Sequence, residues 1–286
     1  MDTTADIKSI AIIGAGTMGQ GIAQIAAMAG YRTVLFDIEK DALEKALKSI
    51  EKNLEKGIEK GKVTQEQRKT ALGNISAVTD LDEVKADFII EAIVERLDVK
   101  QKVFAELERI NSKKTILASN TSSIPITQIG AGLKHPERFV GMHFFNPAHI
   151  MKLVEVISGA ATDDKTAMLT KELAENLGKV AVMAKDSPGF IVNRVARHFY
   201  VEGLKVLEEG VAGMETIDTL VQSSGFKMGP FQLMDLIGVD TNFSVTTSMY
   251  NSFYQDAKFR PSRIQQQKVD AGHHGRKSGK GFYNYE

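Results

Sequence analysis

The sequence predicts an α/β domain with a mostly parallel sheet, followed by an all-helical C-terminal domain. Over the first two thirds of the chain, short runs rich in Ile and Val alternate with helical patterns, as in strands joined by crossover helices. After about residue 185 the pattern shows helices broken by Gly and Pro, and no convincing strand. A length of 286 residues is typical of two domains, and we expect them to span 1–185 and 186–286.

The composition excludes several classes of protein. Basic and acidic residues number 36 each, so no overall positive field is available for nucleic acid or an anionic membrane. The absence of cysteine excludes disulfides, a thiol nucleophile and thiolate zinc sites, and no His, Asp and Glu cluster has metal-ligand spacing. The uncharged stretch 9–31 is long enough for a membrane span, but its five glycines and two glutamines argue against insertion. We expect a cytoplasmic protein without a targeting segment that binds small molecules in a cleft.

The elements of the first domain follow in order from their patterns. An apolar strand over 8–13 leads into the loop GAGTMG, and 20–30 is predicted to be a helix that ends at a C-cap glycine. Residues 41–60 carry Leu and Ile at a 3.6-residue spacing, which predicts a long helix. The remaining segments repeat these two patterns. We expect further strands at 33–36, 75–78, 88–93, 115–118, 139–145, 152–157 and 180–184, and helices at about 98–110 and 163–177.

The second domain begins where the pattern changes, after Asp186. In the segment SPGFIVNR, Ser187 is the predicted N-cap and Pro188 lies in the predicted first turn of a helix that runs to Glu209. The rest of this domain is expected to be helical, with breaks at glycines and prolines.

The glycine-rich loop predicts a dinucleotide site. Gly14, Gly16 and Gly19 fit G-x-G-x-x-G, in which glycines permit a tight turn, close approach of amides to a pyrophosphate, and close helix packing. The second strand ends in Asp37, 18 residues past Gly19, where a carboxylate accepts hydrogen bonds from ribose hydroxyls and repels a 2′-phosphate. We therefore expect NAD in preference to NADP; the alternative is a tight turn without a ligand. The expected contacts in this region are Gly14, Gly16, Thr17, Met18, Gly19 and Asp37.

A histidine and a glutamate form the candidate reacting pair. The strands that carry His143 and Glu155 are separated by NPAHIM, which is too short for a helical crossover, so they should be antiparallel and joined by a tight turn. The two side chains then meet on one face. A carboxylate holds one imidazole nitrogen as a donor and leaves the other to take a proton, which suits removal of a hydroxyl proton while hydride leaves the same carbon. The residues alone leave open a core histidine packed beside phenylalanines.

Three further polar residues and a second histidine accompany this pair. Asn146 and Ser122 are candidate donors to a substrate oxygen, and Ser122 follows a strand at the sheet edge where open α/β sheets place ligands. Asn193, in the first helix of the second domain, implies a cleft between the domains. His149, in the connecting turn, is a second candidate for proton transfer.

Seven sequence blocks, spread over nearly the whole chain, resemble the (S)-3-hydroxyacyl-CoA dehydrogenase family and, within it, the short-chain bacterial 3-hydroxybutyryl-CoA dehydrogenases. The blocks are IGAGTMGQGIAQ, FIIEAIVE, ASNTSSIPIT, RFVGMHFFNPAHIMKLVEVI, KDSPGFIVNR, GPFQLMDLIGVD and GRKSGKGFYNY. The resemblance implies a Rossmann-like domain followed by a helical dimerisation domain, and a homodimer. It also implies NAD-dependent interconversion of (S)-3-hydroxyacyl-CoA and 3-oxoacyl-CoA, with a short chain such as 3-hydroxybutyryl-CoA, in fatty-acid and butanoate metabolism.

The resemblance also implies roles for individual residues. His143 would be the general base and Glu155 its partner. The residues that match positions near the substrate carbonyl or the nicotinamide are Ser122, Asn146 and Asn193. The residues that match cofactor contacts are Asp37, Glu95, Lys100 and Lys277.

The long predicted helix carries the candidate contacts to coenzyme A. Its lysines recur every four residues and form a positive ridge: Lys48, Lys52, Lys56 and Lys60. Nearby acidic residues damp this charge: Glu44, Glu51, Glu55 and Glu59. The pattern alone is also typical of a solvated face with ion pairs. By resemblance, the expected coenzyme A contacts are Ser122, Asn53 and Lys60, with Asn53 at a position where mammalian mitochondrial members have a serine.

Two other functions remain as alternatives. One is oxidation of a free 3-hydroxy acid or sugar acid, as in the related gulonate dehydrogenases, which lack the HFFNP block. The other is a non-catalytic NAD-binding protein, against which the set of His143, Glu155 and Asn193 argues.

Overall fold

The computed structural model describes residues 3–285. The chain divides into two compact units, Met1–Ser187 and Pro188–Glu286. Within the described residues, no helix is both long enough and apolar enough to cross a membrane.

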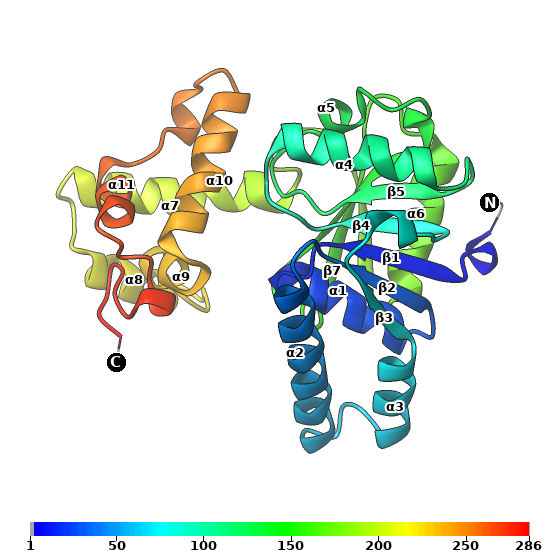
Figure 1. Cartoon of the computed structure of the whole chain (residues 1–286). Helices are drawn as coiled ribbons and strands as arrows, with labels where there is room; N and C mark the ends of the chain where they lie inside the picture. The colour runs from blue at the N-terminus through cyan, green and yellow to red at the C-terminus, as the bar shows by residue number, and fades with distance from the viewer. Residues whose placement is uncertain (1–2, 286) are drawn as a thin grey trace. The chain divides into compact units, whose positions relative to one another are not determined.

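One eight-stranded sheet forms the centre of the first unit (Figure 1). Its strands lie in the order β3-β2-β1-β4-β5-β6-β7-β8. Their bounds are β1 Ser9–Ile13, β2 Arg32–Phe36, β3 Ile75–Val78, β4 Phe88–Glu91, β5 Ile116–Ser119, β6 Phe139–Phe144, β7 Leu153–Ser158 and β8 Val180–Lys185. The first six strands are mutually parallel, β7 is antiparallel to β6, and β8 is parallel to β7. The predicted mostly parallel sheet is confirmed.

The central strands are buried on both faces, which explains their continuous apolar sequences. Every residue of β1, β4 and β5 is buried, as expected where helices cover both faces of a parallel sheet. The strand order reverses at β1, which pairs with β2 on one side and β4 on the other. Ligands of open α/β sheets bind beyond the carboxyl ends of the strands at such a reversal.

The described part of the first unit contains six α-helices beside the sheet. They are α1 Thr17–Met28, α2 Lys40–Glu59, α3 Gln65–Gly73, α4 Leu97–Ile110, α5 Ile126–Gly130 and α6 Asp164–Asn176. The apolar stripe of α2 is buried at Leu43, Ile50 and Leu54, as its 3.6-residue spacing predicts. In Figure 1, α2 and α3 form an antiparallel pair that extends away from the sheet.

Three local expectations for the first unit are corrected. α1 begins at Thr17 rather than at residue 20, with Gly16 as its N-cap. α3 was not predicted, because only Ala71 of that helix is buried; a capping box between Thr64 and Gln67 begins it. The connection from β6 to β7 is a loop over 145–152 rather than a tight turn.

The second unit contains α7 Val192–Glu208, α8 Met214–Ser223, α9 Pro230–Ile237, α10 Val239–Ser252 and α11 Arg263–Asp270. The prediction that Ser187 caps a helix with Pro188 in its first turn is wrong. Gly189 and Phe190 have φ angles of +73° and +48°, a left-handed conformation that no helix can contain. The helix therefore begins only at Val192.

Candidate active site

The glycine loop lies between β1 and α1 and is shaped by close contacts. Gly14 has a φ of +102°, and a Cβ added there would lie 2.7 Å from the carbonyl oxygen of Ala92. A Cβ on Gly19 would lie 1.7 Å from the carbonyl oxygen of Gly14, so the helix packs directly on the loop. Gly16 differs, because its added Cβ would meet nothing within 4 Å. The loop is therefore closed on the protein side and open where a pyrophosphate would approach the α1 N-terminus.

Asp37, just after β2, supports this loop from the side. One of its carboxylate oxygens accepts a hydrogen bond from the Ala15 amide at 2.8 Å, and the other accepts one from the Glu39 amide at 3.0 Å. Each carboxylate oxygen can accept more than one hydrogen bond. Asp37 therefore keeps acceptor capacity for ribose hydroxyls while fixing the glycine loop.

A cavity of about 420 Å³ lies beside Gly14, Gly16 and Asp37. Two large apolar side chains on its border are exposed: Ile38 at 76% and Val94 at 61%. Exposed apolar surface around a concave site favours a flat, weakly polar group such as adenine. The open backbone at Gly16, the acid and the apolar walls together fit an adenine dinucleotide.

The structure brings His143 and Glu155 together. They are directly opposite each other in the antiparallel pair β6–β7. His143 Nδ1 and Glu155 Oε2 are 2.8 Å apart, and the side chains are 6% and 0% exposed. With Glu155 ionised, its carboxylate can only accept, so Nδ1 is then the donor and Nε2 is the ring nitrogen that can accept a proton. The ring centroid of Phe145 lies 4.6 Å from that of His143. His143 therefore has both an aromatic neighbour and an acidic partner.

The loops around this pair are held by residues that the sequence analysis did not identify. Asn120, directly after β5, accepts a hydrogen bond from the Phe144 amide at 2.8 Å and ties the end of β6 to β5. The buried Lys179 ammonium donates to the carbonyl oxygens of Ala148 and Met151 at 2.6 and 2.9 Å, which fixes the 145–152 loop. Neither an asparagine after a strand nor a lysine before one has a distinctive sequence pattern, so only the fold reveals these roles.

Asn146 and His149 lie in that loop, as expected. Asn146 is exposed, while His149 is partly buried. Burial, together with the nearby Lys179 ammonium, lowers the pKa of His149 below its usual value. These effects favour the neutral form of the His149 imidazole.

Ser122 and Glu95 are in direct contact. Glu95 accepts hydrogen bonds from the Ser122 amide at 2.9 Å and from the Thr121 hydroxyl at 2.7 Å. Burial raises the pKa of Glu95, but the Lys100 charge and these hydrogen bonds outweigh it, so the pKa is lowered overall. Lys100, expected as a cofactor contact, is only 1% exposed, and its ammonium lies 2.5 Å from Glu91 and 3.2 Å from Glu95. Glu91 had not been identified from the sequence.

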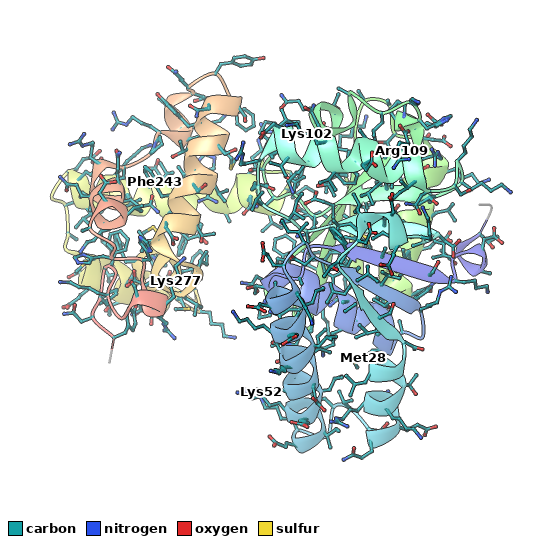
Figure 2. The ribbon with its side chains drawn as sticks, in the orientation of Figure 1. Met28, Lys52, Lys102, Arg109, Phe243 and Lys277 are labelled. Atoms are coloured by element: carbon teal, nitrogen blue, oxygen red, sulfur yellow. The ribbon has the colours of Figure 1, made fainter. Side chains whose placement is uncertain are left out.

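The candidate coenzyme A residues lie on α2. Lys60 is the exposed C-cap residue, Asn53 is partly buried, and Lys52 projects outward from the helix (Figure 2). Two of the acidic residues expected to damp the lysine ridge, Glu51 and Glu55, instead contact Arg68 of α3, at 2.5 and 3.3 Å. The helix absent from the sequence prediction thus neutralises part of that acidic charge.

Two expected site residues belong to the second unit. Asn193 lies in the first turn of α7. Lys277 lies close to the carboxylate of Asp240, at 2.7 Å.

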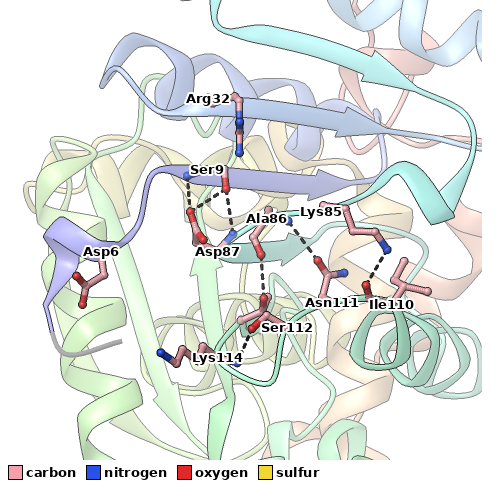
Figure 3. Close-up of a pocket in the computed structure, with 11 residues that line it drawn as sticks. Asp6, Ser9, Arg32, Lys85, Ala86, Asp87, Ile110, Asn111, Ser112 and Lys114 are labelled. Atoms are coloured by element: carbon pink, nitrogen blue, oxygen red, sulfur yellow. Dashed lines mark hydrogen bonds between the residues drawn. The ribbon is translucent and has the colours of Figure 1, made fainter.

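Another cavity, of about 670 Å³, lies at the opposite, amino edge of the sheet (Figure 3). Ser9, Asp87 and Thr115, at or just before the starts of β1, β4 and β5, border it. None of the predicted site residues is among its lining residues. The expected site residues of the first unit lie elsewhere.

Comparisons with known proteins cover nearly the whole chain. Residues 9–187 match the family model of the 3-hydroxyacyl-CoA dehydrogenase NAD binding domain, and residues 189–285 match that of the C-terminal domain. The chain is 46% identical to a 3-hydroxyadipyl-CoA dehydrogenase of Escherichia coli over 98% of this chain and 59% of that protein. It is 45% identical to a probable 3-hydroxybutyryl-CoA dehydrogenase of Bacillus subtilis over 98% of both.

Solved structures agree. A 3-hydroxybutyryl-CoA dehydrogenase of Escherichia coli aligns with a TM-score of 0.94 and 47% identity, over 98% of this chain and 60% of that one. An (S)-3-hydroxybutyryl-CoA dehydrogenase of Ralstonia eutropha aligns with a TM-score of 0.93 and 40% identity, over 98% and 99%. The chain thus spans about three fifths of these Escherichia coli relatives and nearly all of the other two. The predicted Rossmann-like fold, oxidoreductase class and NAD cofactor are confirmed at the level of the family. This chain belongs to the 3-hydroxyacyl-CoA dehydrogenase family, whose amino-terminal domain binds NAD.

Proposed function

We propose that the protein interconverts (S)-3-hydroxyacyl-CoA and 3-oxoacyl-CoA with NAD, acting on the short-chain pair 3-hydroxybutyryl-CoA and acetoacetyl-CoA. The observation that carries the proposal is the 2.8 Å contact between His143 and Glu155 in the same sheet that carries the glycine loop and Asp37. The names of the Bacillus subtilis and Ralstonia eutropha relatives, whose lengths the chain matches almost fully, support the substrate.

Binding of the cofactor uses the carboxyl edge of β1 and β2. In this proposal, the amides at Gly16, Thr17 and Met18 hold the pyrophosphate, Asp37 accepts the ribose hydroxyls, and Ile38 and Val94 cover the adenine. NAD, when bound, supplies the carbon that accepts hydride. Glu95 and Lys277 are the further expected contacts.

In this proposal, His143 is the group that transfers the proton. In the oxidation, Nε2 takes the proton of the 3-hydroxyl group while hydride leaves the carbon that bears it. The imidazolium that results is stabilised by the Glu155 carboxylate on Nδ1. In the reduction, the same nitrogen returns the proton to the carbonyl oxygen. The buried hydrogen bond fixes the ring in the orientation that this exchange requires.

Polar donors assist at the substrate oxygen. Ser122, Asn146 and Asn193 are proposed to donate hydrogen bonds there or to the nicotinamide amide, and donors of this kind stabilise charge that develops on oxygen. Lys60 and Asn53 are proposed to contact coenzyme A, with Ser122 as a third contact.

The two domains, 1–185 and 186–286, are proposed to divide the work between cofactor binding and substrate binding with dimerisation. Large apolar side chains that are exposed in the second unit support a homodimer. They include Val211, Leu220, Phe226 and Leu236. Burial of such side chains against a second copy is favourable. We also propose that the protein is located in the cytoplasm.

One assay tests the proposal. NADH absorbance is followed with acetoacetyl-CoA, with free acetoacetate, or with neither. Rapid NADH consumption with acetoacetyl-CoA alone supports the proposed reaction. Equal rates with free acetoacetate indicate a dehydrogenase of free acids, and no consumption with either indicates a non-catalytic NAD-binding protein.

The Escherichia coli relative named 3-hydroxyadipyl-CoA dehydrogenase supports a second candidate substrate, 3-hydroxyadipyl-CoA. This relative matches 98% of this chain. Comparing kcat/KM for 3-hydroxybutyryl-CoA and 3-hydroxyadipyl-CoA in the oxidative direction decides between the two.

A further inference from the structure

A buried ion pair lies at the ends of β4 and β5, next to the loop that carries Glu95. The Lys100 ammonium is 2.5 Å from a Glu91 carboxylate oxygen, and the two side chains are 1% and 0% exposed. A lone buried charge is strongly unfavourable, so each of these groups depends on the other.

Glu91 is fixed from several sides. Besides Lys100, it accepts hydrogen bonds from the Ile93 amide at 2.7 Å and from the Ser119 hydroxyl at 2.6 Å. Glu91 is the last residue of β4, and Ser119 is the last of β5. The carboxylate therefore locks together two strand ends from which the site loops emerge.

Lys100 connects Glu91 to Glu95. Its ammonium lies 3.2 Å from Glu95, whose side chain is 37% exposed. Glu95 in turn accepts from the Thr121 hydroxyl and from the amides of Ser122 and Ser123, at 2.7, 2.9 and 3.1 Å. A continuous series of contacts thus runs from the buried Glu91 to Ser122.

We propose that Glu91 is a positioning residue that fixes Lys100 and Glu95, and through Glu95 holds Ser122 in place for the substrate. This inference rests on the proposed function, in which Ser122 contacts the substrate. Glu91 is fully buried and acts only through its neighbours, whereas Glu95 is partly exposed and accepts a hydrogen bond from the Ser122 amide.

The test is a double-mutant cycle of Lys100→Met, Glu91→Gln and the double variant, measured by steady-state kinetics with NADH and acetoacetyl-CoA. Lys102→Met is the matched control, because Lys102 is an exposed lysine of the same helix (Figure 2). Loss of folded enzyme lowers kcat but leaves KM unchanged, so KM separates positioning from a merely structural role.

We expect each single variant to raise the KM for acetoacetyl-CoA about tenfold, since small displacements of site groups have effects of this size or larger. The double variant should lie within about threefold of the Lys100→Met variant, because the two residues act as one unit. The control should stay within about twofold of the wild type. A normal KM in Glu91→Gln, or multiplicative losses in the double variant, would overturn the proposal.

A milder variant keeps the test decisive if the ion-pair variants fail to fold. Thr121→Val removes one hydrogen bond to Glu95 and leaves the ion pair intact. We expect a raised KM for acetoacetyl-CoA in the folded fraction, and an unchanged KM would overturn the proposal. If wild-type enzyme does not reduce acetoacetyl-CoA, the proposed function fails by itself. The dissociation constant of NADH is then measured for the same variants. Equal increases in Glu91→Gln and Lys100→Met support the positioning role, and an increase in Lys100→Met alone contradicts it.

Discussion

The two edges of the sheet both carry cavities, and they differ in how their lining groups are satisfied. At the amino edge, Asp87 accepts hydrogen bonds from the amides of Lys8 and Ser9. Figure 3 shows the Ser9 bond, and also the Lys85 ammonium, which donates to the Ile110 carbonyl. At the carboxyl edge, the cavity is bordered by bare backbone at Gly16 and by exposed apolar side chains.

The comparison teaches that volume alone does not identify a site. The amino-edge cavity is larger, about 670 against 420 Å³, yet several of its polar groups bind one another. At the carboxyl edge, the exposed Gly16 backbone and the exposed apolar side chains have no evident role in stabilising the fold. We expect substitutions at the carboxyl edge to change catalysis and those at the amino edge to change stability.

The largest effect is expected for His143→Gln. Loss of the proton-transfer group should lower kcat by about two to four powers of ten, while NADH affinity changes little because the glycine loop and Asp37 are intact. Steady-state kinetics and NADH fluorescence titration measure the two quantities. Near-normal turnover would remove His143 from the mechanism.

The next effect concerns cofactor choice. Asp37→Asn keeps a hydrogen-bond acceptor but removes the charge, so NADH should bind about tenfold more weakly, as expected for loss of a charged hydrogen-bond partner. The ratio of NADPH to NADH affinity should rise, because a 2′-phosphate no longer meets a carboxylate. Titration of both cofactors measures the ratio, and an unchanged ratio would show that Asp37 does not contact the ribose.

A smaller effect is expected for Lys60→Glu. Reversing an exposed charge should raise the KM for acetoacetyl-CoA about threefold at low salt, and the difference should shrink at high salt as screening increases. Lys45→Glu, an exposed lysine elsewhere on α2, is the control with the same change in net charge. Equal KM values in both variants would exclude a contact between Lys60 and coenzyme A.

The amino edge should show the smallest effect on catalysis. Asp87→Ala leaves the amides of Lys8 and Ser9 and the Ser9 hydroxyl without their acceptor, so the free energy of unfolding should fall by about 1–3 kcal/mol. The kcat and both KM values should remain those of the wild type. A large change in KM would show that this edge also contributes to binding.

The sequence predicted the order of strands and helices and brought His143 to Glu155, because short apolar runs and the brief connector between two strands limit the possible pairings. It placed α1 too late, since glycines are poor helix formers but good N-caps. It missed α3, which has hardly any buried face to produce a period. The start of α7 was misplaced because the Ser-Pro sequence suits a helix start, whereas the backbone at Gly189 and Phe190 is left-handed.

The supporting residues of the site were beyond sequence reasoning for a different reason. Glu91, Asn120 and Lys179 act through contacts with segments distant in the chain. A glutamate at the end of an apolar strand, or a lysine before one, has many possible partners, and only the register of the sheet selects the real ones. Local patterns therefore identify the glycine loop and the reacting pair better than the residues that hold them.

A crystal structure of the wild-type protein with NAD and acetoacetyl-CoA tests the central claim most directly. This pair of oxidised ligands cannot react by hydride transfer, so both remain in place. We predict His143 Nε2 within about 2.6–3.2 Å of the 3-oxo oxygen, with Nδ1 still bound to Glu155. A 3-oxo group bound away from this imidazole, or a His143 ring turned from Glu155, would contradict it.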